Sequence, residues 1–355
     1  MIAFLSQIGY VLVGVLLLGI LVAVHEFGHF MAARLTGIEV MEFAIGMGPK
    51  LIGWTGKRGT KFSLRCIPFG GFCAFYGEDD VEGKSKDDPR AYNKQAVWKR
   101  MITVAMGPVM NFVLAFVVLT GYLWYVGDAV VEPYIYGVEE NGPAYVAGIQ
   151  TDDVITAVNG VNVLDGTKDT LIAAIDGDDP LVLTVRRGSE VFETTADPFW
   201  DDNTRSYRIG ITVSGHIVDT LPISFGTAVS RGWSDCLSFS TAILDALRAL
   251  VTTGEGLDET GGPVAVISMV SQEVANYGVD AFITMLAFIS VNLGIMNLLP
   301  IPGLDGSRLL FHAIEGVRGK PIKPELEGTI HLVGTLLLLG LLAIITLRDV
   351  WRLFV

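Results

Sequence analysis

The stretch from Met1 to Val24 contains no charged residue. A helix rises 1.5 Å per residue, so a helix over this stretch is long enough to cross the hydrocarbon core of a bilayer, which is roughly 30 Å thick. The stretch lacks the basic start and the small-residue cleavage site of a secretory signal peptide. It therefore predicts a retained membrane helix, and a chain that contains such a helix folds in lipid.

Three further stretches are uncharged or nearly so and are long enough to span a membrane: Met101 to Gly127, Ala281 to Leu304, and Gly328 to Leu347. Hydrophobic residues make up 51% of the 355-residue chain, and the mean hydropathy is +0.50. These values are too apolar for an ordinary soluble protein of this length. The sequence thus predicts a polytopic α-helical membrane protein with four transmembrane helices in the lipid bilayer.

The net charge of −13 is distributed unevenly along the chain. The connection from Arg34 to Arg100 carries 12 basic residues, whereas the region from Asp128 to Gly278 carries 23 acidic residues against 7 basic ones. Cytoplasmic loops of membrane proteins are enriched in Lys and Arg. We therefore expect the first region to be cytoplasmic and the acidic region, together with both termini, to lie outside. Arg348 and Arg352 conflict with this orientation, but the larger asymmetry outweighs them.

Three ionisable residues, His25, Glu26 and His29, stand at the inner end of the first apolar stretch. Residues four apart share one face of a helix, so the two imidazoles can bind one metal ion while Glu26 points beside them. This is the HExxH arrangement of zinc enzymes. The alternative is a pair of interfacial histidines with a glutamate that reaches the membrane surface, but ionisable groups within membrane helices usually have a function.

The third apolar stretch ends in NLLPIPGLDG, where Pro300 and Pro302 prevent a regular helix from continuing. Asp305 lies just beyond these prolines. A lone aspartate at the end of a membrane helix is usually a solvated cap, yet Asp305 is the best candidate for the third ligand that two histidines need in a zinc site. In the second stretch, Pro108 indicates a kink and Asn111 a hydrogen bond to a neighbouring helix.

The connection after the first apolar stretch consists of short apolar pieces separated by glycines. From Lys61 to Cys66, polar and apolar residues alternate with the period of a half-buried strand. Small hairpins at the inner membrane face and an ordinary amphipathic loop both fit this region. The charged segment from Glu78 to Arg90 has no apolar period and indicates a flexible connection.

The acidic outer region has the composition of a water-exposed domain from Pro133 to Ser214. Within it, Leu181 to Arg186 and Glu190 to Thr195 alternate as strands around a short turn. Apolar residues then recur near helical spacing from Leu221 to Gly254. We interpret this last segment as an amphipathic helix on the outer membrane surface, although a buried helix of a soluble domain would show a similar pattern.

Together these motifs resemble those of the site-2 protease family of intramembrane zinc metalloproteases, most closely its bacterial branch that contains the regulator of sigma-E protease. HEFGH matches the HExxH of the family, GPVMNF matches GPxxNF, and NLLPIPGLDG matches NxxPxPxLDG. The motifs occur in the family's order and spacing, and the resemblance covers nearly the whole chain. It also implies that Glu39 to Tyr76 is the family's membrane-associated β region, which favours strands there.

The segment from Pro133 to Ser214 resembles the PDZ domain of these enzymes, present once, with Asp152 and Asp153 where the family usually has Gly-Asp. The resemblance implies four transmembrane helices, a membrane-associated β-hairpin region and an inserted extracytoplasmic PDZ-like α+β domain. The implied order is residues 1–36, first span with HExxH; 37–96, cytoplasmic-side β region and loop; 97–127, second span; 128–215, extracytoplasmic PDZ-like domain; 216–278, extracytoplasmic amphipathic helix region; 279–306, third span with the LDG motif; 307–327, cytoplasmic loop; and 328–355, fourth span and carboxyl terminus.

The resemblance implies a zinc ion, Zn2+, held by His25, His29 and Asp305, with Glu26 as the general base that moves a proton from water to the leaving amine. A substrate helix that unwinds in lipid needs new partners for its backbone groups. We expect it to pair with an exposed edge of the β region and to contact the third span. The candidate substrate-binding residues are Gly70, Gly71, Phe72, Asn292 and Asn297.

The expected function is hydrolysis of peptide bonds within or near transmembrane segments of single-pass substrates, such as anti-sigma factors or remnant signal peptides. The resemblance places the protein in the bacterial cytoplasmic (inner) membrane, where it acts after an upstream site-1 protease has cut the same substrate. No nucleic-acid partner is expected.

Two other function classes fit parts of the pattern. One is a non-catalytic membrane scaffold or chaperone with structural zinc, and the other is a metal transporter. Glu26 favours the enzyme, because a structural zinc site closes with four protein ligands and needs no adjacent base. A transporter would need polar residues along several spans, whereas here they gather at one depth.

Overall fold

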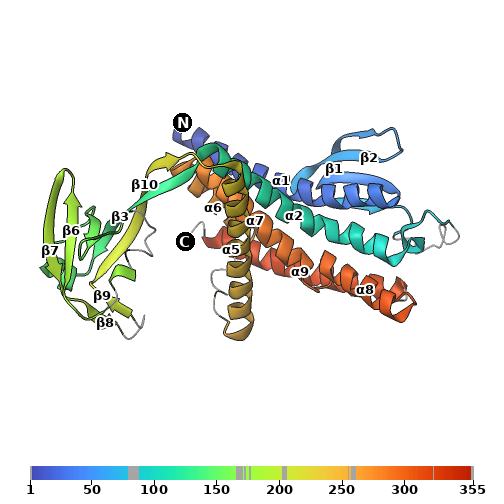
Figure 1. The fold of residues 1–355 in the computed structure, drawn as a ribbon. Coiled ribbons are helices and arrows are strands. Elements are labelled where there is room, and N and C mark those ends of the chain that lie inside the picture. The colour runs from blue at the N-terminus through green and yellow to red at the C-terminus, as the bar shows by residue number, and fades with distance from the viewer. Residues whose placement is uncertain are drawn as a thin grey trace. The chain divides into compact units, whose positions relative to one another are not determined.

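The structure is a computed structural model that describes residues 2–78, 88–164, 171, 173–175, 177–201, 206–254, 256, 261–322 and 324–352. Most of the predicted flexible connection between Glu78 and Arg90 therefore lies outside the described residues. The chain divides into two compact units. The first combines Met1–Tyr122 with Val229–Val355, and the second comprises Leu123–Ala228. Figure 1 shows that helices dominate the first unit and strands dominate the second.

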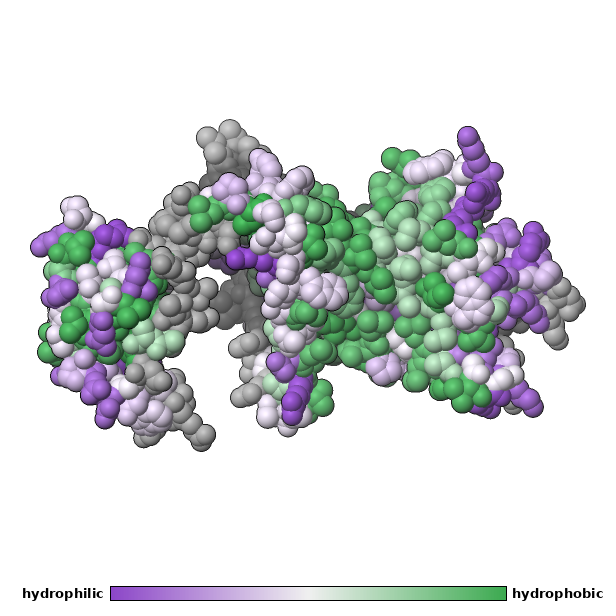
Figure 2. Space-filling view, in the orientation of Figure 1, coloured by the Kyte–Doolittle hydropathy of each residue, from purple (hydrophilic) through white to green (hydrophobic). Residues whose placement is uncertain are grey.

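Among the described residues, four helices are long and apolar enough to cross a membrane. They are α1 (Ile2–Thr36), α2 (Val97–Val126), α7 (Val279–Leu298) and α9 (Pro324–Arg352). Figure 2 shows hydrophobic residues over this helical part, with hydrophilic residues gathered at the end where α8 lies. The four predicted membrane helices are thus confirmed as helices of the required length and composition.

The third membrane helix is shorter than the sequence predicted. α7 ends at Leu298 rather than at Leu304. Pro300 and Pro302 have no N–H group and cannot extend the helix. The chain turns here instead, and the Leu304 N–H donates to the Ile301 carbonyl at 3.0 Å. This turn leads directly into the next helix.

Residues 307–327, predicted as a loop, contain most of a helix, so that prediction was wrong. This helix, α8 (Asp305–Arg318), begins at Asp305 and ends at Gly319, which has a φ of 66°. Its buried face is formed by Gly306, Ser307 and His312, which are small or polar residues. Apolar residues nevertheless recur at helical spacing along this segment, at Leu310, Ile314 and Val317, so the sequence carried a signal for the helix that the loop prediction overlooked.

Residues 216–278, predicted as one amphipathic helix region, contain two helices, α5 (Phe225–Thr252) and α6 (Pro263–Tyr277). α5 agrees with the helix predicted from Leu221 to Gly254, and one face of it shares a core with α2 and α7. α6 packs against α1, where Val270 is fully buried. The first half of α6 is apolar on every side, so periodicity did not separate it from its surroundings.

Glycines let the helices of the first unit cross closely. A Cβ atom added at Gly28 of α1 would lie 2.2 Å from the Met106 carbonyl oxygen of α2. A Cβ atom at Gly334 of α9 would lie 2.3 Å from the Cβ atom of Pro302. Any larger residue would push these elements apart, and small residues serve this purpose in membrane proteins generally. The crossing at Gly28 brings the HExxH segment of α1 against α2.

The predicted β region forms strands, as the resemblance implied. β1 (Val40–Thr55) and β2 (Lys61–Phe75) pair antiparallel with several register shifts. Ile45 lies opposite both Gly71 and Leu64, so the middle of β1 lies between two segments of β2. Within the described part of the chain, the segment Gly71–Phe75 pairs with β1 on one side only.

The second unit is built on a sheet with the strand order β10-β3-β4-β6-β7, and β5 pairs with β4. Its elements are β3 (Asp128–Val138), α3 (Pro143–Val146), β4 (Val154–Val158), β5 (Val161–Asn162), β6 (Leu181–Arg187), β7 (Glu190–Ala196), the β8 (Phe199–Asp201) and β9 (Ser206–Arg208) pair, and β10 (Ile211–Leu221). β6 and β7 confirm the two strands predicted from alternation. Leu181, Leu183 and Val185 alternate into the hydrophobic core of this unit.

The sheet of the second unit begins at residue 128, the implied start of the domain, but runs beyond its implied end at residue 215. β3 begins at Asp128, β10 ends at Leu221, and these two residues lie opposite each other. The extra residues of β10 pair with β3 as an antiparallel ladder, which their mixed polarity did not indicate. Backbone hydrogen bonding between the two strands, rather than side-chain pattern, sets the true limits.

The two aspartates that replace the family's Gly-Asp have different surroundings. Asp153 is fully buried, and its carboxylate accepts two hydrogen bonds from Arg187, both at 2.7 Å. It also accepts the Gln150 N–H at 2.8 Å. Asp152 has a φ of 70°, in the left-handed region that favours glycine. Asp153 therefore has a structural role, while Asp152 occupies a backbone position suited to the missing glycine.

Candidate metal centre

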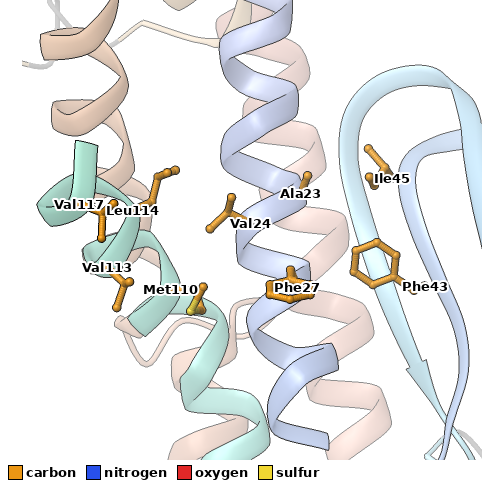
Figure 3. Close-up of a pocket in the computed structure, with 9 residues that line it drawn as sticks. All are labelled: Ala23, Val24, Phe27, Phe43, Ile45, Met110, Val113, Leu114 and Val117. Atoms are coloured by element: carbon orange, nitrogen blue, oxygen red, sulfur yellow. The ribbon is translucent and has the colours of Figure 1, made fainter. Parts of the chain in front are cut away.

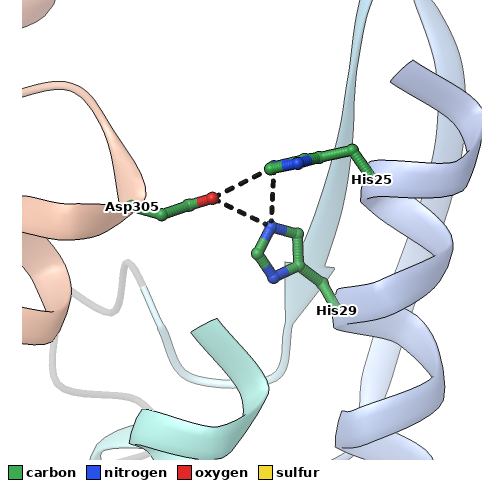
Figure 4. Close-up of side chains that lie close together, drawn as sticks. All are labelled: His25, His29 and Asp305. Atoms are coloured by element: carbon green, nitrogen blue, oxygen red, sulfur yellow. Dashed lines mark hydrogen bonds and ion pairs between the residues drawn. The ribbon is translucent and has the colours of Figure 1, made fainter. Parts of the chain in front are cut away.

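Three side chains with metal-binding groups converge where α1 meets the start of α8 (Figure 4). His25 Nε2 lies 3.0 Å from Asp305 Oδ2, and His29 Nε2 lies 3.3 Å from the same oxygen. The two Nε2 atoms are 3.2 Å apart. Both histidines are only 8% exposed. The structure thus brings together the three residues that the sequence offered as metal ligands.

The distances within this group fit a zinc ion. Zinc lies about 2.0–2.2 Å from nitrogen and oxygen ligands, so a tetrahedral site has edges of about 3.3–3.6 Å, close to the separations here. The three observed separations lie between 3.0 and 3.3 Å. In the described part of the chain, the buried Asp305 Oδ2 accepts no hydrogen bond of acceptable geometry. A buried carboxylate oxygen of this kind needs a cation or donors to compensate its charge.

Gly107 of α2 leaves room beside the group. A Cβ atom at this position would lie 2.3 Å from His29 Nε2 and 2.9 Å from His25 Nε2. Both distances are shorter than van der Waals contact, so alanine at this position would displace the imidazoles or whatever they bind. The donor set, the orphaned oxygen and this space together fit zinc.

α2 orients both histidines of α1 through their second nitrogens. His29 Nδ1 lies 2.9 Å from the Thr103 carbonyl oxygen. A carbonyl only accepts, so Nδ1 carries the proton and Nε2 keeps its lone pair for a metal. His25 Nδ1 lies 3.2 Å from the side-chain amide of Asn111, which is fully buried. The geometry of the metal group therefore depends on how α2 packs against α1.

Asp305 owes its position to the turn after α7. It is the first residue of α8, and a Cβ atom at the following Gly306 would lie 2.3 Å from the Leu298 carbonyl oxygen. Glycine at this position allows the start of α8 to sit directly against the end of α7. This close approach brings the Asp305 carboxylate to the histidines of α1.

Glu26 lies next to the histidines in sequence but does not belong to the group of three ligands. β2 passes beside it. A Cβ atom at Gly71 would lie 3.0 Å from Glu26 Cγ. The Glu26 side chain therefore lies against the segment of β2 that pairs on one side only.

The other proposed substrate-binding residues occupy two elements. Gly71 and Phe72 belong to the one-sided segment of β2, and Gly70 precedes it with a φ of 76°. Asn292 and Asn297 lie half-buried on α7. The structure thus brings Gly71 next to Glu26, and among the described residues it shows no hydrogen bond between the two asparagines and the three ligand candidates.

A second set of polar side chains surrounds α8 outside the metal group. Arg308 pairs with Glu78, which follows β2, and His312 Nε2 lies 3.0 Å from Tyr92 Oη. Burial, together with the charges of Arg100 and Arg308, lowers the pKa of His312 to about 4. His312 is therefore neutral at neutral pH. These contacts hold α8, and with it Asp305, against the residues that follow β2 and those that precede α2.

An apolar cavity of about 550 Å³ lies between α1, α2 and β1. Figure 3 shows the side chains that line it. They are Ala23, Val24, Phe27, Phe43, Ile45, Met110, Val113, Leu114 and Val117. The cavity borders the strand that pairs with the Gly71 segment, since Ile45 lies opposite Gly71.

The sequence did not reveal which helices cross at the metal group. Asn111 was expected to bond a neighbouring helix, and its hydrogen bond to His25 of α1 confirms this, but neither Asn111 nor Gly107 was placed at the metal group. Their spacing of one helical turn puts both on one face of α2, and this signal could have directed them toward α1. Arg308 and Tyr92 gave no comparable signal, because their partners lie far away along the chain.

Several solved PDZ domains are similar to part of the chain. The PDZ domain of an SdrC-like protein from Listeria innocua is 22% identical, with a TM-score of 0.22, and the match covers 24% of this chain and 96% of that domain. A PDZ domain of an SdrC-like protein from Listeria monocytogenes is 20% identical, with a TM-score of 0.21, over 23% of this chain and 86% of that domain.

Relatives over the whole length are named as proteases. A protein of Clostridium perfringens named as a zinc metalloprotease is 34% identical over 344 residues, covering 96% of this chain and 98% of the relative. One of Agrobacterium fabrum with the same description is 32% identical over 361 residues, covering 96% of both chains. A protein of Enterococcus faecalis named as the protease eep is 31% identical over 421 residues, covering 96% of this chain and 98% of the relative.

The pattern of peptidase family M50 matches residues 13–341. This span includes the HExxH segment, the GPVMNF segment and Asp305. Together with the relatives of full length, the match shows that the chain belongs to peptidase family M50, the site-2 protease family, and is a zinc metalloprotease.

Proposed function

We propose that the chain is an intramembrane protease that cuts peptide bonds within or near transmembrane segments of single-pass proteins. The observation that carries this proposal is the meeting of His25, His29 and Asp305 among apolar helices, with Glu26 adjacent and outside the ligand group. A structural zinc site would use a fourth protein ligand and no base. Three ligands and a free carboxylate support catalysis instead.

The residues of the site divide the chemistry between them. Bound by His25, His29 and Asp305, zinc would activate a water molecule and polarise the peptide carbonyl. Glu26 would accept the proton of that water and return it to the leaving amine. The low exposure of the two histidines supports a site that admits few water molecules.

A substrate helix must open before it can be cut, because its carbonyls are bonded within the helix. In lipid, each unpaired backbone group costs several kcal/mol. The Gly71–Phe75 segment supports a way to offset this cost, since it pairs on one side only among the described residues and lies against Glu26. A substrate strand added there would bring its backbone beside the base. Asn292 and Asn297 on α7 are the further candidate donors.

The apolar cavity between α1, α2 and β1 supports the same substrate class (Figure 3). Its lining contains no polar side chain among the residues named above. Apolar side chains of a membrane segment would lose contact with lipid at no cost there, whereas charged ones would be excluded. Single-pass proteins such as anti-sigma factors, or remnant signal peptides, carry segments of this composition.

We further propose that the second unit, which contains Pro133 to Ser214, stands outside the bacterial inner membrane and limits access. The acidic balance of its sequence and the basic character of the Arg34 to Arg100 connection support this orientation. A substrate with a large outer domain would collide with such a unit. One already shortened by an upstream site-1 protease would pass.

The decisive experiment is a cleavage assay with the purified full-length protein in liposomes and a panel of tagged single-span peptides. Glu26→Gln should abolish cleavage and leave zinc bound, because it removes the base and spares all three ligands. Zinc content measured on the same samples provides the control. Near-normal turnover by the variant would contradict the proposed role of Glu26.

A matched pair of substrates, long and short on the outer side, tests the access limit. Deleting Pro133 to Ser214 should permit cleavage of the long substrate and change the rate on the short one little. Loss of activity on the short substrate without gain on the long one would mean that the unit recruits substrates or assists folding.

A further inference from the structure

The two histidines of the metal group are oriented by partners of different kinds. His29 Nδ1 faces the Thr103 carbonyl oxygen, which can only accept a hydrogen bond. His25 Nδ1 faces the Asn111 carboxamide at 3.2 Å, which can donate through Nδ2 or accept through Oδ1. The orientation of this amide therefore decides which nitrogen of His25 carries the proton.

The amide is placed with Nδ2 toward His25, and this orientation has two consequences. Asn111 Oδ1 is buried without a hydrogen-bond partner among the described residues. An imidazole that accepts at Nδ1 carries its proton on Nε2, directed toward Asp305 Oδ2 at 3.0 Å. That proton occupies the Nε2 lone pair that His25 needs in order to bind a metal. A half-turn of the amide exchanges two atoms of nearly equal size and removes this conflict.

We propose that Asn111 is a positioning residue that accepts the His25 Nδ1–H through Oδ1 and so keeps His25 Nε2 free for zinc. The inference rests on the zinc site of the proposed function. It gives His25 the same arrangement that the Thr103 carbonyl gives His29. Outer partners of this kind hold the tautomer and ring orientation of metal-binding histidines.

The backbone around Asn111 is fixed independently of its amide. Asn111 is fully buried, and the Ser290 hydroxyl of α7 donates to its carbonyl oxygen at 2.8 Å. A Cβ atom at Gly294, one turn further along α7, would lie 3.2 Å from the Pro108 carbonyl oxygen. α2 is therefore held against α7 at this level, and the amide is presented to His25 by a rigid support.

Two substitutions separate an accepting role from a donating one. Asn111→Asp keeps the shape and offers only acceptors when ionised, whereas Asn111→Leu keeps a similar volume and offers neither. Zinc affinity is measured by competition with a chromophoric chelator on the purified full-length protein. We expect the zinc dissociation constant to rise about 10- to 100-fold in Asn111→Leu and to stay within about threefold of wild type in Asn111→Asp.

Ser290→Ala is the matched control, because it removes a hydrogen bond to the same residue without altering the amide. Its zinc affinity should stay within about threefold of wild type. Wild-type affinity in Asn111→Leu would overturn the inference, and so would a loss in Asn111→Asp as large as in Asn111→Leu. If Asn111→Leu does not fold, Asn111→Asp decides alone: a tenfold loss relative to Ser290→Ala overturns the inference, and near-wild-type affinity supports it.

The same samples distinguish this inference from the proposed function. Zinc binding by the wild type without cleavage of any peptide in the panel would contradict the proposed function and leave the role of Asn111 standing. Cleavage by the wild type with unchanged zinc affinity in Asn111→Leu would contradict only the role of Asn111. Absence of zinc binding by the wild type would overturn both.

Discussion

Asp153 in the second unit is fully buried and Asp305 in the first is partly exposed, and the two carboxylates have opposite surroundings. In the second unit, Asp153 accepts hydrogen bonds from the Arg187 guanidinium and from the Gln150 N–H, at 2.7 to 2.8 Å. In the first unit, Asp305 faces the imidazoles of His25 and His29, and its Oδ2 accepts no hydrogen bond among the described residues. A guanidinium always carries a charge that neutralises a carboxylate, whereas an imidazole does so only when it is protonated.

The contrast shows how to tell a structural carboxylate from a ligand in this chain. The charge of Asp153 is compensated within the protein, because neighbouring residues donate all the hydrogen bonds that it needs. The charge of Asp305 is compensated fully only when a cation binds. Both lie at the start of a regular element, so local sequence does not distinguish them, and their difference in burial does not show which one is a ligand. The partners, which come from distant parts of the chain, do.

The largest expected effect comes from removing the Asp305 carboxylate. Asp305→Ala should weaken zinc binding by more than about 100-fold, since even the loss of an outer partner of a ligand costs about 10- to 100-fold. Asp153→Ala should leave zinc affinity unchanged. Metal analysis after dialysis against a chelator measures both. Full zinc content in Asp305→Ala would show that Asp305 only caps α8 and that the third ligand lies elsewhere.

The next largest effect comes from removing the cation that pairs with Asp153. Arg187→Met leaves a buried carboxylate without its cation, so we expect the second unit to lose about 3 kcal/mol of its free energy of unfolding. Hydrogen exchange of the β4 and β6 amides in the full-length protein measures this loss. Arg208→Met is the control, because its ion pair with Asp201 is more exposed and should contribute less than about 1 kcal/mol. Equal losses of stability in the two variants would show that the Arg187–Asp153 pair contributes no more than an exposed ion pair.

A pH experiment tests the role of the buried His312 in the stability of the first unit. Burial and nearby arginine charges lower the pKa of His312 from 6.5 to about 4. The unfolded chain therefore takes up a proton near pH 6.5, while the folded chain does so only near pH 4. The free energy of unfolding should fall between these pH values by about 2–3 kcal/mol at most. Exchange of the α8 amides at pH 7.5 and pH 5 measures it, and His312→Asn should remove most of the difference. An equal pH effect in the variant would assign it to another group.

The smallest effect concerns the residue beside Asp153. Asp152 has a φ of 70°, so Asp152→Gly should relieve backbone strain and stabilise the second unit by about 0.5 kcal/mol. Asp152→Ala should destabilise it by about 1 kcal/mol, because alanine tolerates this conformation less well than aspartate. Exchange of the β4 amides measures both changes. Stabilisation by alanine would mean that the charge, and not the backbone conformation, is unfavourable there.

The sequence predicted those parts of the fold that depend on local pattern. The apolar stretches gave the four membrane helices, and alternation gave β6 and β7. The helix α8 was missed although Leu310, Ile314 and Val317 recur at helical spacing, because the segment was interpreted only as the connection between two membrane spans. The end of β10 was missed because its pairing with β3, and not side-chain polarity, extends it to Leu221.

The candidate site shows the same division. The spacing of His25 and His29 placed two ligands on one helical face, and the chemistry of zinc pointed to Asp305 as the third. Gly107 and Asn111 lie at the metal group because α1 and α2 cross there. The sequence of either helix alone does not specify this crossing. The contacts of α8 with Tyr92 and Glu78 likewise arise only after the chain has folded.

The metal group draws its members from near the beginning and near the end of the chain, at positions 25 and 305. During synthesis, a ribosome therefore releases His25, Glu26 and His29 into the membrane long before Asp305 exists. A chain made only to that point holds two of the candidate ligands and the candidate base but lacks the third ligand. We therefore expect it to be inactive until the turn after α7 and Asp305 have been made.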